Sequence, residues 1–489
     1  MLRPKKWRVK NSQLLARGSK GLLLSVVKVK ITDAMRFPLK LLLAGLALLV
    51  LNPLLHAQVS FAPATNYVVV SGFAPGVPIS VAAADVNGDG KADLVCANFM
   101  NNNLSVLTNK GSGSLGSNAT YAVASSPRFV VAADINGDGK PDLICSLSPA
   151  NKIIVLTNNG TGILGSNAIY TVGDNPTSVV AADINVDGKA DLICANWGAT
   201  GDGNTLSVLT NNGTGGFGSN ATLVVGPAPQ GPSSVTAADV NGDAKLDLIC
   251  ANTRSNSLSI FTNDGSGNFV LSSSPMVGRG PFSVNSADVN GDGKIDLISA
   301  NPTDNTLSIL TNDGSGGFAL SSSPSVGAIP RSVAVADVNG DGNVDLISAN
   351  YNDNTLSVLT NDGSGGFVLA ALPGVGSNPD SPVTADINGD GRLDLISANY
   401  GNGNGNTLSV VINTSTFLPL LTLNHSSNKV MVSWASQWTG WAGWTLQQNT
   451  NLNTTSWTSF SGTIGDDGTT KTVTNSPTTG NLFFRLTHP

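Results

Sequence analysis

The stretch DVNGDGNVDL, from Asp337 to Leu346, decides the fold of this chain. It places three aspartates, two asparagines and two glycines within nine residues and then turns apolar. Loops of the same form begin at Asp85, Asp134, Asp183, Asp239, Asp288, Asp337 and Asp386. The successive intervals between them are 49, 49, 56, 49, 49 and 49 residues. A unit that recurs seven times at a period near 50 identifies a repeat architecture.

One repeat unit, Arg331–Leu369, contains four short segments that are rich in Val, Ile, Leu and Thr. We expect strands at residues 331–336, 346–349, 356–360 and from 367 onward. The acidic loop separates the first two strands, and the hairpin sequence NDGSGG separates the last two. Asp-Gly and Gly-Gly are strong hairpin signals because they tolerate positive φ. Four strands in a period near 50 are typical of a β-propeller blade, which predicts an all-β, seven-bladed propeller.

The two ends of the repeat region favour a closed ring over a linear solenoid. The seventh unit has its third strand at Thr407–Asn413 but lacks the Gly-Gly-Phe strand that should follow. The segment Ser60–Ser71, before the first loop, resembles the outer strand of other blades, such as Leu115–Ser125. We therefore expect the N-terminal strand to complete the seventh blade, which removes exposed sheet edges. A solenoid would instead carry capping repeats.

Each acidic loop has the form Asp-x-Asn-x-Asp-x-x-x-Asp. Side chains at positions 1, 3 and 5 converge when the backbone coils, a Gly at position 6 allows the sharp turn, and Asp at position 9 closes the site. Ligation by oxygen alone in a flexible cage suits Ca²⁺, whereas Mg²⁺ prefers stricter geometry with fewer protein ligands. The loops contain no thiolate or imidazole, which argues against zinc and copper. The alternative is an Asx-rich turn that binds no metal.

The predicted ligands are the side chains at positions 1, 3, 5 and 9, giving about one Ca²⁺ per blade and up to seven in all. They are Asp85, Asn87, Asp89, Asp93, Asp134, Asn136, Asp138, Asp142, Asp183, Asn185, Asp187, Asp191, Asp239, Asn241, Asp243, Asp247, Asp288, Asn290, Asp292, Asp296, Asp337, Asn339, Asp341, Asp345, Asp386, Asn388, Asp390 and Asp394. Position 7 is cationic in six loops and would bring a loaded loop close to neutrality. These residues are Lys91, Lys140, Lys189, Lys245, Lys294 and Arg392.

These loops resemble the calcium loops of FG-GAP/VCBS repeats, which form the blades of integrin-α-type seven-bladed propellers. The resemblance covers about Gln58–Thr414, and the Gly-Gly-Phe turns ending at Phe217, Phe318 and Phe367 are similar to the family's outer-strand motif. It implies one calcium in the loop between the first and second strands of a blade. The ligands carried over by the resemblance are the same four side chains of each loop.

Two loops depart from the common pattern. Val186 replaces Gly at position 4 of the third loop, and we expect little effect because Gly188 keeps position 6. Ala244 replaces Gly at position 6 of the fourth loop. If position 6 needs positive φ, Ala is strained there by about 1 kcal/mol. The loop at Asp239–Asp247 is therefore predicted to bind calcium most weakly.

The N-terminal region predicts export. Residues 35–57 combine Arg36 and Lys40, an apolar run at Leu41–Leu51 and a cleavage site after Ala57, as in a secretory signal peptide. An uncleaved membrane anchor is the alternative, but the apolar run is about half the length of a membrane span. Residues 1–34 are a basic extension or a start assigned too far upstream. The mature chain is expected to have no stable membrane span and to be secreted or held at the cell surface.

The charge of the mature part disfavours nucleic acid as a partner. Residues 58–489 contain 15 Lys and Arg against 31 Asp, and the sequence contains no Glu. Such an acidic surface repels nucleic acid and anionic lipid. The three His residues lie outside the propeller, so acid–base chemistry there would fall to Asp, Lys, Arg or Tyr. We therefore expect a protein without enzymatic activity, with a polysaccharide lyase as the alternative.

Isolated residues in the repeats receive structural interpretations. Cys96, Cys145, Cys194 and Cys250 occupy one repeated position, where blades five to seven have Ser, and are expected to be buried free thiols. Equivalent points on neighbouring blades are too far apart for a disulfide unless they lie near the axis. The scattered arginines are interpreted as surface salt links in preference to a substrate clamp. They are Arg128, Arg254, Arg279 and Arg331.

After residue 414 the repeat stops and a small β-sandwich is predicted for residues 415–489. Strands are expected at Lys429–Ser436, Trp444–Asn449, Trp457–Gly462, Lys471–Asn475 and Leu482–Leu486. Five of the seven Trp lie between Trp434 and Trp457, where they either form the core or stack on sugar rings. The segment resembles a C-terminal module of secreted bacterial proteins, which implies attachment, sorting or glycan contact.

Together these features predict a secreted calcium-binding propeller that mediates adhesion or recognition of an extracellular protein or glycan. The alternatives are an extracellular carbohydrate-active enzyme and a structural component of a surface coat. The ligand is not encoded in a readable pattern, because propeller ligands are chosen by surface residues and the fold does not fix the function.

Overall fold

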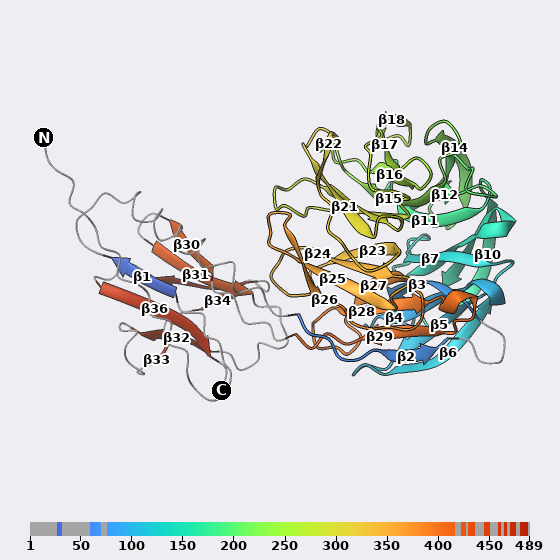
Figure 1. The fold of residues 1–489 in the computed structure, drawn as a ribbon. Helices are drawn as coiled ribbons and strands as arrows, with labels where there is room; N and C mark the ends of the chain where they lie inside the picture. The colour runs from blue at the N-terminus through green and yellow to red at the C-terminus, as the bar shows by residue number, and fades with distance from the viewer. Residues whose placement is uncertain are drawn as a thin grey trace, which may run out of the picture. The chain divides into compact units, whose positions relative to one another are not determined.

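The computed structural model describes residues 27–31, 59–69, 76–415, 422–426, 429–435, 445–449, 458–460, 464–466, 470–475 and 480–487. The chain divides into a unit at residues 46–418 and a second unit formed by residues 1–45 and 419–489. The first unit contains seven antiparallel four-stranded sheets (Figure 1). The predicted signal peptide and most of the predicted basic extension lie outside the described residues.

Blades one to four each use four consecutive strands. They consist of β3 (Pro78–Ala84), β4 (Asp93–Asn98), β5 (Asn103–Asn109) and β6 (Leu115–Ala122); β7 (Pro127–Ala133), β8 (Asp142–Leu147), β9 (Lys152–Asn158) and β10 (Leu164–Thr171); β11 (Pro176–Ala182), β12 (Asp191–Asn196), β13 (Thr205–Asn211) and β14 (Phe217–Val224); and β15 (Pro232–Ala238), β16 (Asp247–Asn252), β17 (Ser257–Asn263) and β18 (Phe269–Ser273).

The later blades repeat this order, and the seventh takes its fourth strand from the start of the chain. They consist of β19 (Ser283–Ala287), β20 (Asp296–Asn301), β21 (Thr306–Asn312) and β22 (Phe318–Ser322); β23 (Pro330–Ala336), β24 (Asp345–Asn350), β25 (Thr355–Asn361) and β26 (Phe367–Ala371); and β27 (Pro379–Ala385), β28 (Asp394–Asn399) and β29 (Thr407–Val411) with β2 (Thr65–Val68). The predicted four-stranded blades are confirmed, and the first three strands of the sixth blade begin and end within one residue of their predicted bounds.

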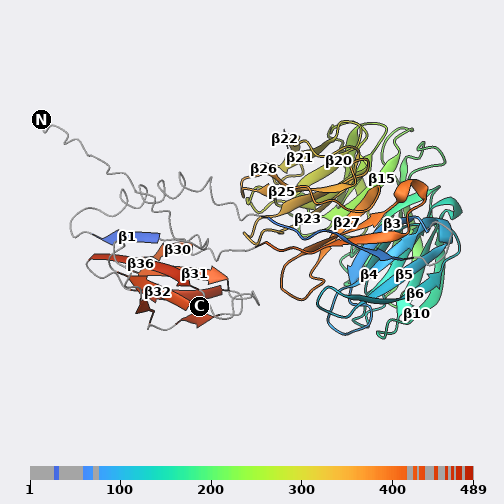
Figure 2. The ribbon, with the colours of Figure 1, turned by 60° about the horizontal axis from the view of Figure 1, so that its bottom comes forward.

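The first strand of each blade lies innermost. Each of these strands contacts the first strands of both neighbouring blades, which closes a ring in the order β3, β7, β11, β15, β19, β23, β27 and back to β3. Figure 2 shows β23, β27 and β3 next to one another in this ring. The second strand of each blade is buried along its whole length because neighbouring blades cover both of its faces. This burial explains why the Leu-Ile/Val-Cys/Ser sequence after the last Asp of each loop is not interrupted by charged residues. It lacks the apolar–polar alternation of a sheet that has one solvent-exposed face.

The ring is closed by chain segments more than 300 residues apart. Strand β2 pairs antiparallel with β29, placing Tyr67 opposite Leu408. An isolated bridge between Phe61 and Asn413 extends this pairing. The predicted closure by the N-terminal strand is therefore confirmed. It covers the free edge of β29, an edge that would otherwise invite pairing with another chain.

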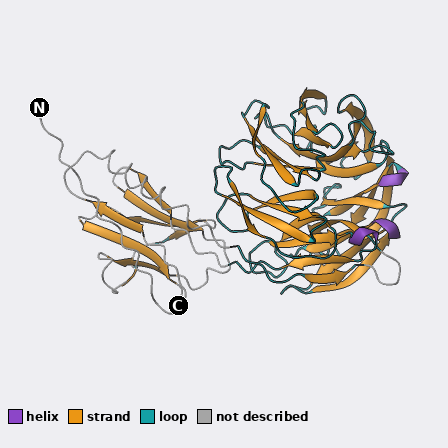
Figure 3. Cartoon of the chain, viewed as in Figure 1, coloured by secondary structure: helices purple, strands orange, loops and turns teal. Residues whose placement is uncertain are grey.

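The second unit contains two four-stranded sheets (Figure 3). One is formed by β1 (Val27–Ile31), β36 (Gly480–Thr487), β32 (Thr445–Asn449) and β33 (Thr458–Ser459), and the other by β30 (Thr422–Ser426), β31 (Lys429–Ala435), β35 (Thr470–Asn475) and β34 (Gly465–Asp466). Leu446 from one sheet and Val473 from the other are both buried, as in the predicted β-sandwich. The side chains of the clustered Trp residues lie outside the described part.

Strand β1 comes from the region predicted as a basic extension and pairs with β36. We did not predict this strand, although Val27–Ile31 reads VKVKI and alternates apolar and polar residues as a half-buried strand does. Within the described residues, no helix is long and apolar enough to cross a membrane.

Candidate metal centres

The first acidic loop is held in a coil by bonds between its own side chains and backbone. The two carboxylate oxygens of Asp85 accept hydrogen bonds from the amides of Gly88 and Gly90, both at 2.7 Å. The side-chain oxygen of Asn87 accepts one from the amide of Asp89 at 2.9 Å. The amide of Lys91 donates to Asp89 at 3.0 Å. Asx bonds of this kind explain why Asp and Asn alternate in the loop.

Positions 4 and 6 of the loops adopt positive φ, which explains the paired glycines. In the first loop these angles are 77° at Gly88 and 81° at Gly90. The fourth loop keeps this shape with Ala244 at 64°, so the expected strain at position 6 is present. The third loop keeps it with Val186 at 60°. We did not expect strain at Val186, but a β-branched residue is a genuine outlier in this region.

The third loop also loses a hydrogen bond. In the other six loops, the amide at position 4 donates to the aspartate at position 1, at 2.6 to 2.8 Å. Among the described residues, the Val186 amide makes no corresponding bond with Asp183, although Asp187 and Gly188 still donate to that carboxylate. Among the described residues, the third loop thus lacks one hydrogen bond at the residue that departs from the pattern, while its backbone keeps the common shape.

The aspartate at position 9 differs from the others because it is fully buried. Asp93 accepts a hydrogen bond from the amide of Val86 at 3.2 Å and another from the amide of Asn109 at 2.7 Å. The same two bonds recur in every blade and join the acidic loop to the end of the third strand. The equivalent carboxylates belong to Asp142, Asp191, Asp247, Asp296, Asp345 and Asp394.

Burial raises the pKa of each position-9 carboxyl, while the two backbone amides act in the opposite direction. The effect is largest in blades six and seven, where burial raises the pKa of Asp345 to about 7 and that of Asp394 to about 6. In the same blade-six loop Asn339 is also fully buried. A cation close to these oxygens would favour the ionised form.

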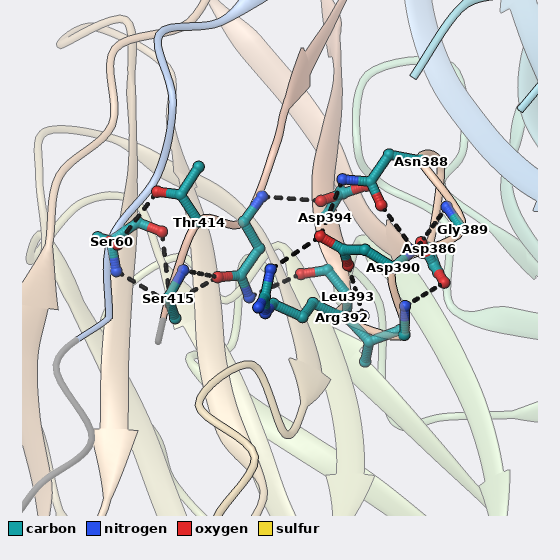
Figure 4. Close-up of polar contacts among 12 residues, drawn as sticks. Ser60, Asp386, Asn388, Gly389, Asp390, Arg392, Leu393, Asp394, Thr414 and Ser415 are labelled. Carbon is teal, nitrogen blue, oxygen red and sulfur yellow. Dashed lines mark hydrogen bonds and ion pairs between the residues drawn. The ribbon is translucent and has the colours of Figure 1, made fainter. Parts of the chain in front are cut away.

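The cation at position 7 pairs with the carboxylate at position 5 of its own loop. The Lys–Asp pairs have N–O distances of 3.4 to 3.7 Å, and Arg392 lies 2.9 Å from Asp390 (Figure 4). The predicted charge compensation therefore takes the form of a direct ion pair. These pairs are partly exposed, so each contributes little to stability by itself.

The predicted ligands lie in the predicted loops, but they do not form a closed cage. Among the described residues, no three Asp, His or Cys side chains lie together as a metal-binding group. The oxygens at positions 1 and 5 accept backbone amides, and position 5 also pairs with the cation. The donor set is nonetheless oxygen-only and carboxylate-rich, which fits a hard cation such as Ca²⁺. The side chains that would hold it are those at positions 1, 3, 5 and 9.

Comparison with known families agrees with the repeat. The model of the FG-GAP-like repeat matches residues 85–145, 134–194, 187–250, 239–299, 288–348 and 337–397. Five of the six matched segments begin at the first aspartate of an acidic loop, and together they cover more than half of the chain. The chain belongs to the FG-GAP-like repeat family. No curated protein matches this sequence.

Solved structures show that the FG-GAP-like ring shares its fold with distant proteins. Two are crystal structures of BBS1N in complex with ARL6DN, one soaked with lead and one with mercury. They are each 13% identical, have TM-scores of 0.50 and 0.51, and cover 73% and 72% of this chain and 98% and 96% of theirs. A protein from Lactobacillus plantarum is 14% identical with a TM-score of 0.49, covering 62% of this chain and 86% of its own.

The FG-GAP-like repeats contain a further functional residue that sequence reasoning missed. An Asn ends the third-strand segment of every blade, and its Nδ2 donates to the carbonyl at position 2 of the preceding blade's acidic loop at 2.7 to 3.0 Å. The pairs are Asn109–Ile387, Asn158–Val86, Asn211–Ile135, Asn263–Ile184, Asn312–Val240, Asn361–Val289 and Asn413–Val338. The sequence signal that could have identified this residue is the recurrence of the Asn at the same position of every repeat.

The four cysteines of the FG-GAP-like ring are buried and free, which confirms the interpretation from sequence. Burial raises the pKa of each thiol well above its ordinary value. A thiol that stays protonated is a poor nucleophile and a poor metal ligand, so these residues serve packing.

Proposed function

We propose that this chain is a calcium-binding propeller, secreted or held at the cell surface, that recognises an extracellular protein or glycan. The observation that carries the proposal is the sevenfold acidic loop, whose oxygen donors are built into the junctions between blades. Calcium that binds only the folded ring stabilises it by mass action. Extracellular calcium modules bind with Kd of about 10⁻⁴ to 10⁻³ M, so the ring would be loaded outside the cell.

The role of the metal in this proposal is structural. The position-9 carboxylate links the acidic loop to the third strand. The Asn that ends the third-strand segment, which we call the latch Asn, links that strand to the loop of the preceding blade. A cation held by the loop carboxylates would therefore stabilise the contacts that hold the blades together. The rigid ring then presents its surface residues to a partner, and binding, not turnover, is its activity. The excess of Asp over Lys and Arg after residue 57 disfavours nucleic acid as that partner.

A binding screen tests this proposal. The calcium-loaded protein is applied to arrays of extracellular glycans and matrix proteins, and the same screen is repeated with chelator. We expect saturable binding that weakens when calcium is removed. Assaying the bound glycans for lyase products by ultraviolet absorbance tests for catalysis, and turnover that copurifies with the chain would contradict the binding role.

A further inference from the structure

In every blade a proline stands at or just before the start of the first, innermost strand. The residue after this proline occupies an equivalent position near the propeller axis in all seven blades. These residues are Ile79, Arg128, Thr177, Ser233, Phe282, Arg331 and Asp380. The acidic loops follow the opposite ends of the same segments, so this position belongs to the other face of the ring. Two of the residues are arginines that we interpreted from sequence as surface salt links. Salt links are present at Arg279, whose side chain is 68% exposed and pairs with Asp304, and at Arg331, which pairs with Asp380 but also contacts aromatic rings.

Arg331 lies within a cluster built from several blades. Its Nη1 is 3.2 Å from Asp380, and its guanidinium carbon lies 3.8 Å from the ring centroid of Tyr351. The same carbon is 5.6 Å from the ring of Tyr400 and 5.8 Å from that of Phe282. Blades five, six and seven thus supply a guanidinium, a carboxylate and three aromatic rings to one place.

A fourth ring joins the cluster from blade three. The ring centroids of Trp197 and Phe282 are 5.9 Å apart, in an edge-to-face arrangement. Trp197, Phe282 and Tyr400 are all partly exposed. Aromatic side chains bury large apolar areas when covered, so leaving three of them partly open at one end of the ring is a feature expected of a binding surface. We call these residues, together with Arg331, Tyr351, Asp380 and Arg128, the axial cluster.

Arg128 contributes a second guanidinium from blade two. Its charge interacts with those of Asp380 and Arg331, and burial lowers its pKa. Within the described part of the chain its side chain makes no hydrogen bond or ion pair, although a guanidinium offers five donors. It remains partly exposed. The axial cluster therefore holds two guanidinium groups against one carboxylate, and one guanidinium is left for a ligand.

The polar residues at the equivalent position of blades three and four behave differently. The Thr177 hydroxyl donates to the carbonyl of Pro232 at 3.3 Å, and the Ser233 hydroxyl donates to that of Pro281 at 3.2 Å. These hydroxyls join neighbouring inner strands and are satisfied within the fold. Among the described residues, the Arg128 side chain makes no such bond between inner strands. Hydrogen bonding within the fold therefore does not explain why an arginine occupies this position.

We propose that the axial cluster binds the carboxylate of an acidic sugar, a hexuronate residue of an extracellular polysaccharide, through Arg128 and Arg331. A carboxylate matches the planar fork of a guanidinium, and the apolar face of a pyranose ring packs on aromatic side chains. An acidic peptide would also satisfy the arginines but would not need the partly open rings. The inference names the ligand class of the recognition function proposed above and rests on it.

Calorimetric titration of the full calcium-loaded chain tests the inference. The probes are oligomers of galacturonate, glucuronate and mannuronate, with the matching neutral oligosaccharides and a poly-aspartate peptide as comparisons. We expect at least one acidic oligosaccharide to bind, and its neutral counterpart and the peptide to bind at least about tenfold more weakly, as expected when charge-assisted hydrogen bonds are lost. Equal binding of the neutral sugar, preference for the peptide, or no binding of any uronate overturns the inference.

Variants locate the site. Arg128→Gln should weaken uronate binding at least about tenfold, and Arg128→Lys should restore part of it, while Arg279→Gln serves as the matched surface control and should leave binding unchanged. Because Arg128 makes no internal bond, its variants should fold, which thermal melting checks. Unchanged uronate binding by Arg128→Gln overturns the inference. The recognition function fails separately, if the chain binds nothing on the glycan and protein arrays.

Discussion

Asn158, at the end of strand β9, donates its side-chain amide to the backbone carbonyl of Val86, 2.8 Å away in the acidic loop of the preceding blade. The same Nδ2 donates to the carbonyl of Pro141 in its own loop at 3.0 Å, and the Asn158 backbone amide donates to Asp142 at 2.7 Å. One residue therefore joins two acidic loops. Because this arrangement recurs at all seven junctions, the loops are part of the contact between blades.

Removing one of these latches should destabilise the ring. Asn158→Ala removes both hydrogen bonds of the Asn158 Nδ2, to the carbonyls of Pro141 and Val86, although the Val86 carbonyl keeps a bond from the Gly162 amide at 3.1 Å. We expect this loss to cost about 2 to 3 kcal/mol of unfolding free energy. Asn159→Ala is the matched control, because Asn159 is exposed and its side chain bonds only to Thr161 within the hairpin, so it should cost less than about 1 kcal/mol. Urea unfolding measures both. Equal losses of unfolding free energy in the two variants would show that the hydrogen bonds of Asn158 between blades do not stabilise the ring.

A glycine at position 4 of the third loop should stabilise the folded protein. Val186→Gly removes a β-branched side chain from φ of 60° and should raise the unfolding free energy by about 1 kcal/mol. Val186→Ala keeps a side chain in the left-handed region and should gain much less, which separates backbone strain from side-chain exposure. Thermal unfolding compares the two variants. A larger gain with Ala than with Gly would refute the explanation by strain.

The fourth loop allows a parallel test of metal affinity. Ala244→Gly relieves φ of 64° and should tighten calcium binding at the loop of Asp239–Asp247 by up to about tenfold, which is about 1.4 kcal/mol. The strain at Val186 means that the third loop now competes with the fourth as the weakest site. Calcium titration of both glycine variants ranks the two loops, and no change in either isotherm would argue against strain as the cause of weak binding.

Without calcium, the unfolding free energy of the protein should change with pH in the direction opposite to ordinary acid unfolding. The folded-state pKa values of Asp345, about 7, and Asp394, about 6, lie above the ordinary value of 3.8. The folded state therefore binds more protons than the unfolded state between pH 4 and 7, and stability falls as the pH rises through that window. Urea unfolding in EGTA at pH 5 and pH 7.5 measures this change.

Asp345→Asn is the matched variant for the pH test. Its amide cannot ionise, so the chelated variant should lose less stability than the parent between the same two pH values. A parent protein that is more stable at pH 7.5 than at pH 5 in EGTA would contradict the assignment of these raised pKa values to the folded state.

Much of this fold could be predicted because each repeated residue is sampled seven times. The period of the acidic loop fixes the blades, and the missing fourth strand after Thr407–Asn413 points to closure by the N-terminus. The hydrogen-bond partner of the latch Asn could not be predicted in this way, because it lies in another blade and is a backbone carbonyl with no sequence signature. The strain at Val186 was missed because the need for positive φ at position 4 is hidden when Gly fills it in the other loops.

The axial cluster was missed for a different reason. Arg128, Arg331 and Asp380 are single departures from the repeat, far apart along the sequence. They meet only because the inner strands converge on one axis. A pattern search notes such residues as exceptions, whereas the ring geometry brings them together.

The role of the acidic loops is tested by counting the metal bound to the purified chain and by following its thermal unfolding with calcium and with EGTA. We expect about six to seven Ca²⁺ per chain and a large upward shift of Tm with calcium. A chain that carries no calcium and unfolds at the same temperature in EGTA would contradict the claim that the sevenfold acidic loops hold a metal that stabilises the ring.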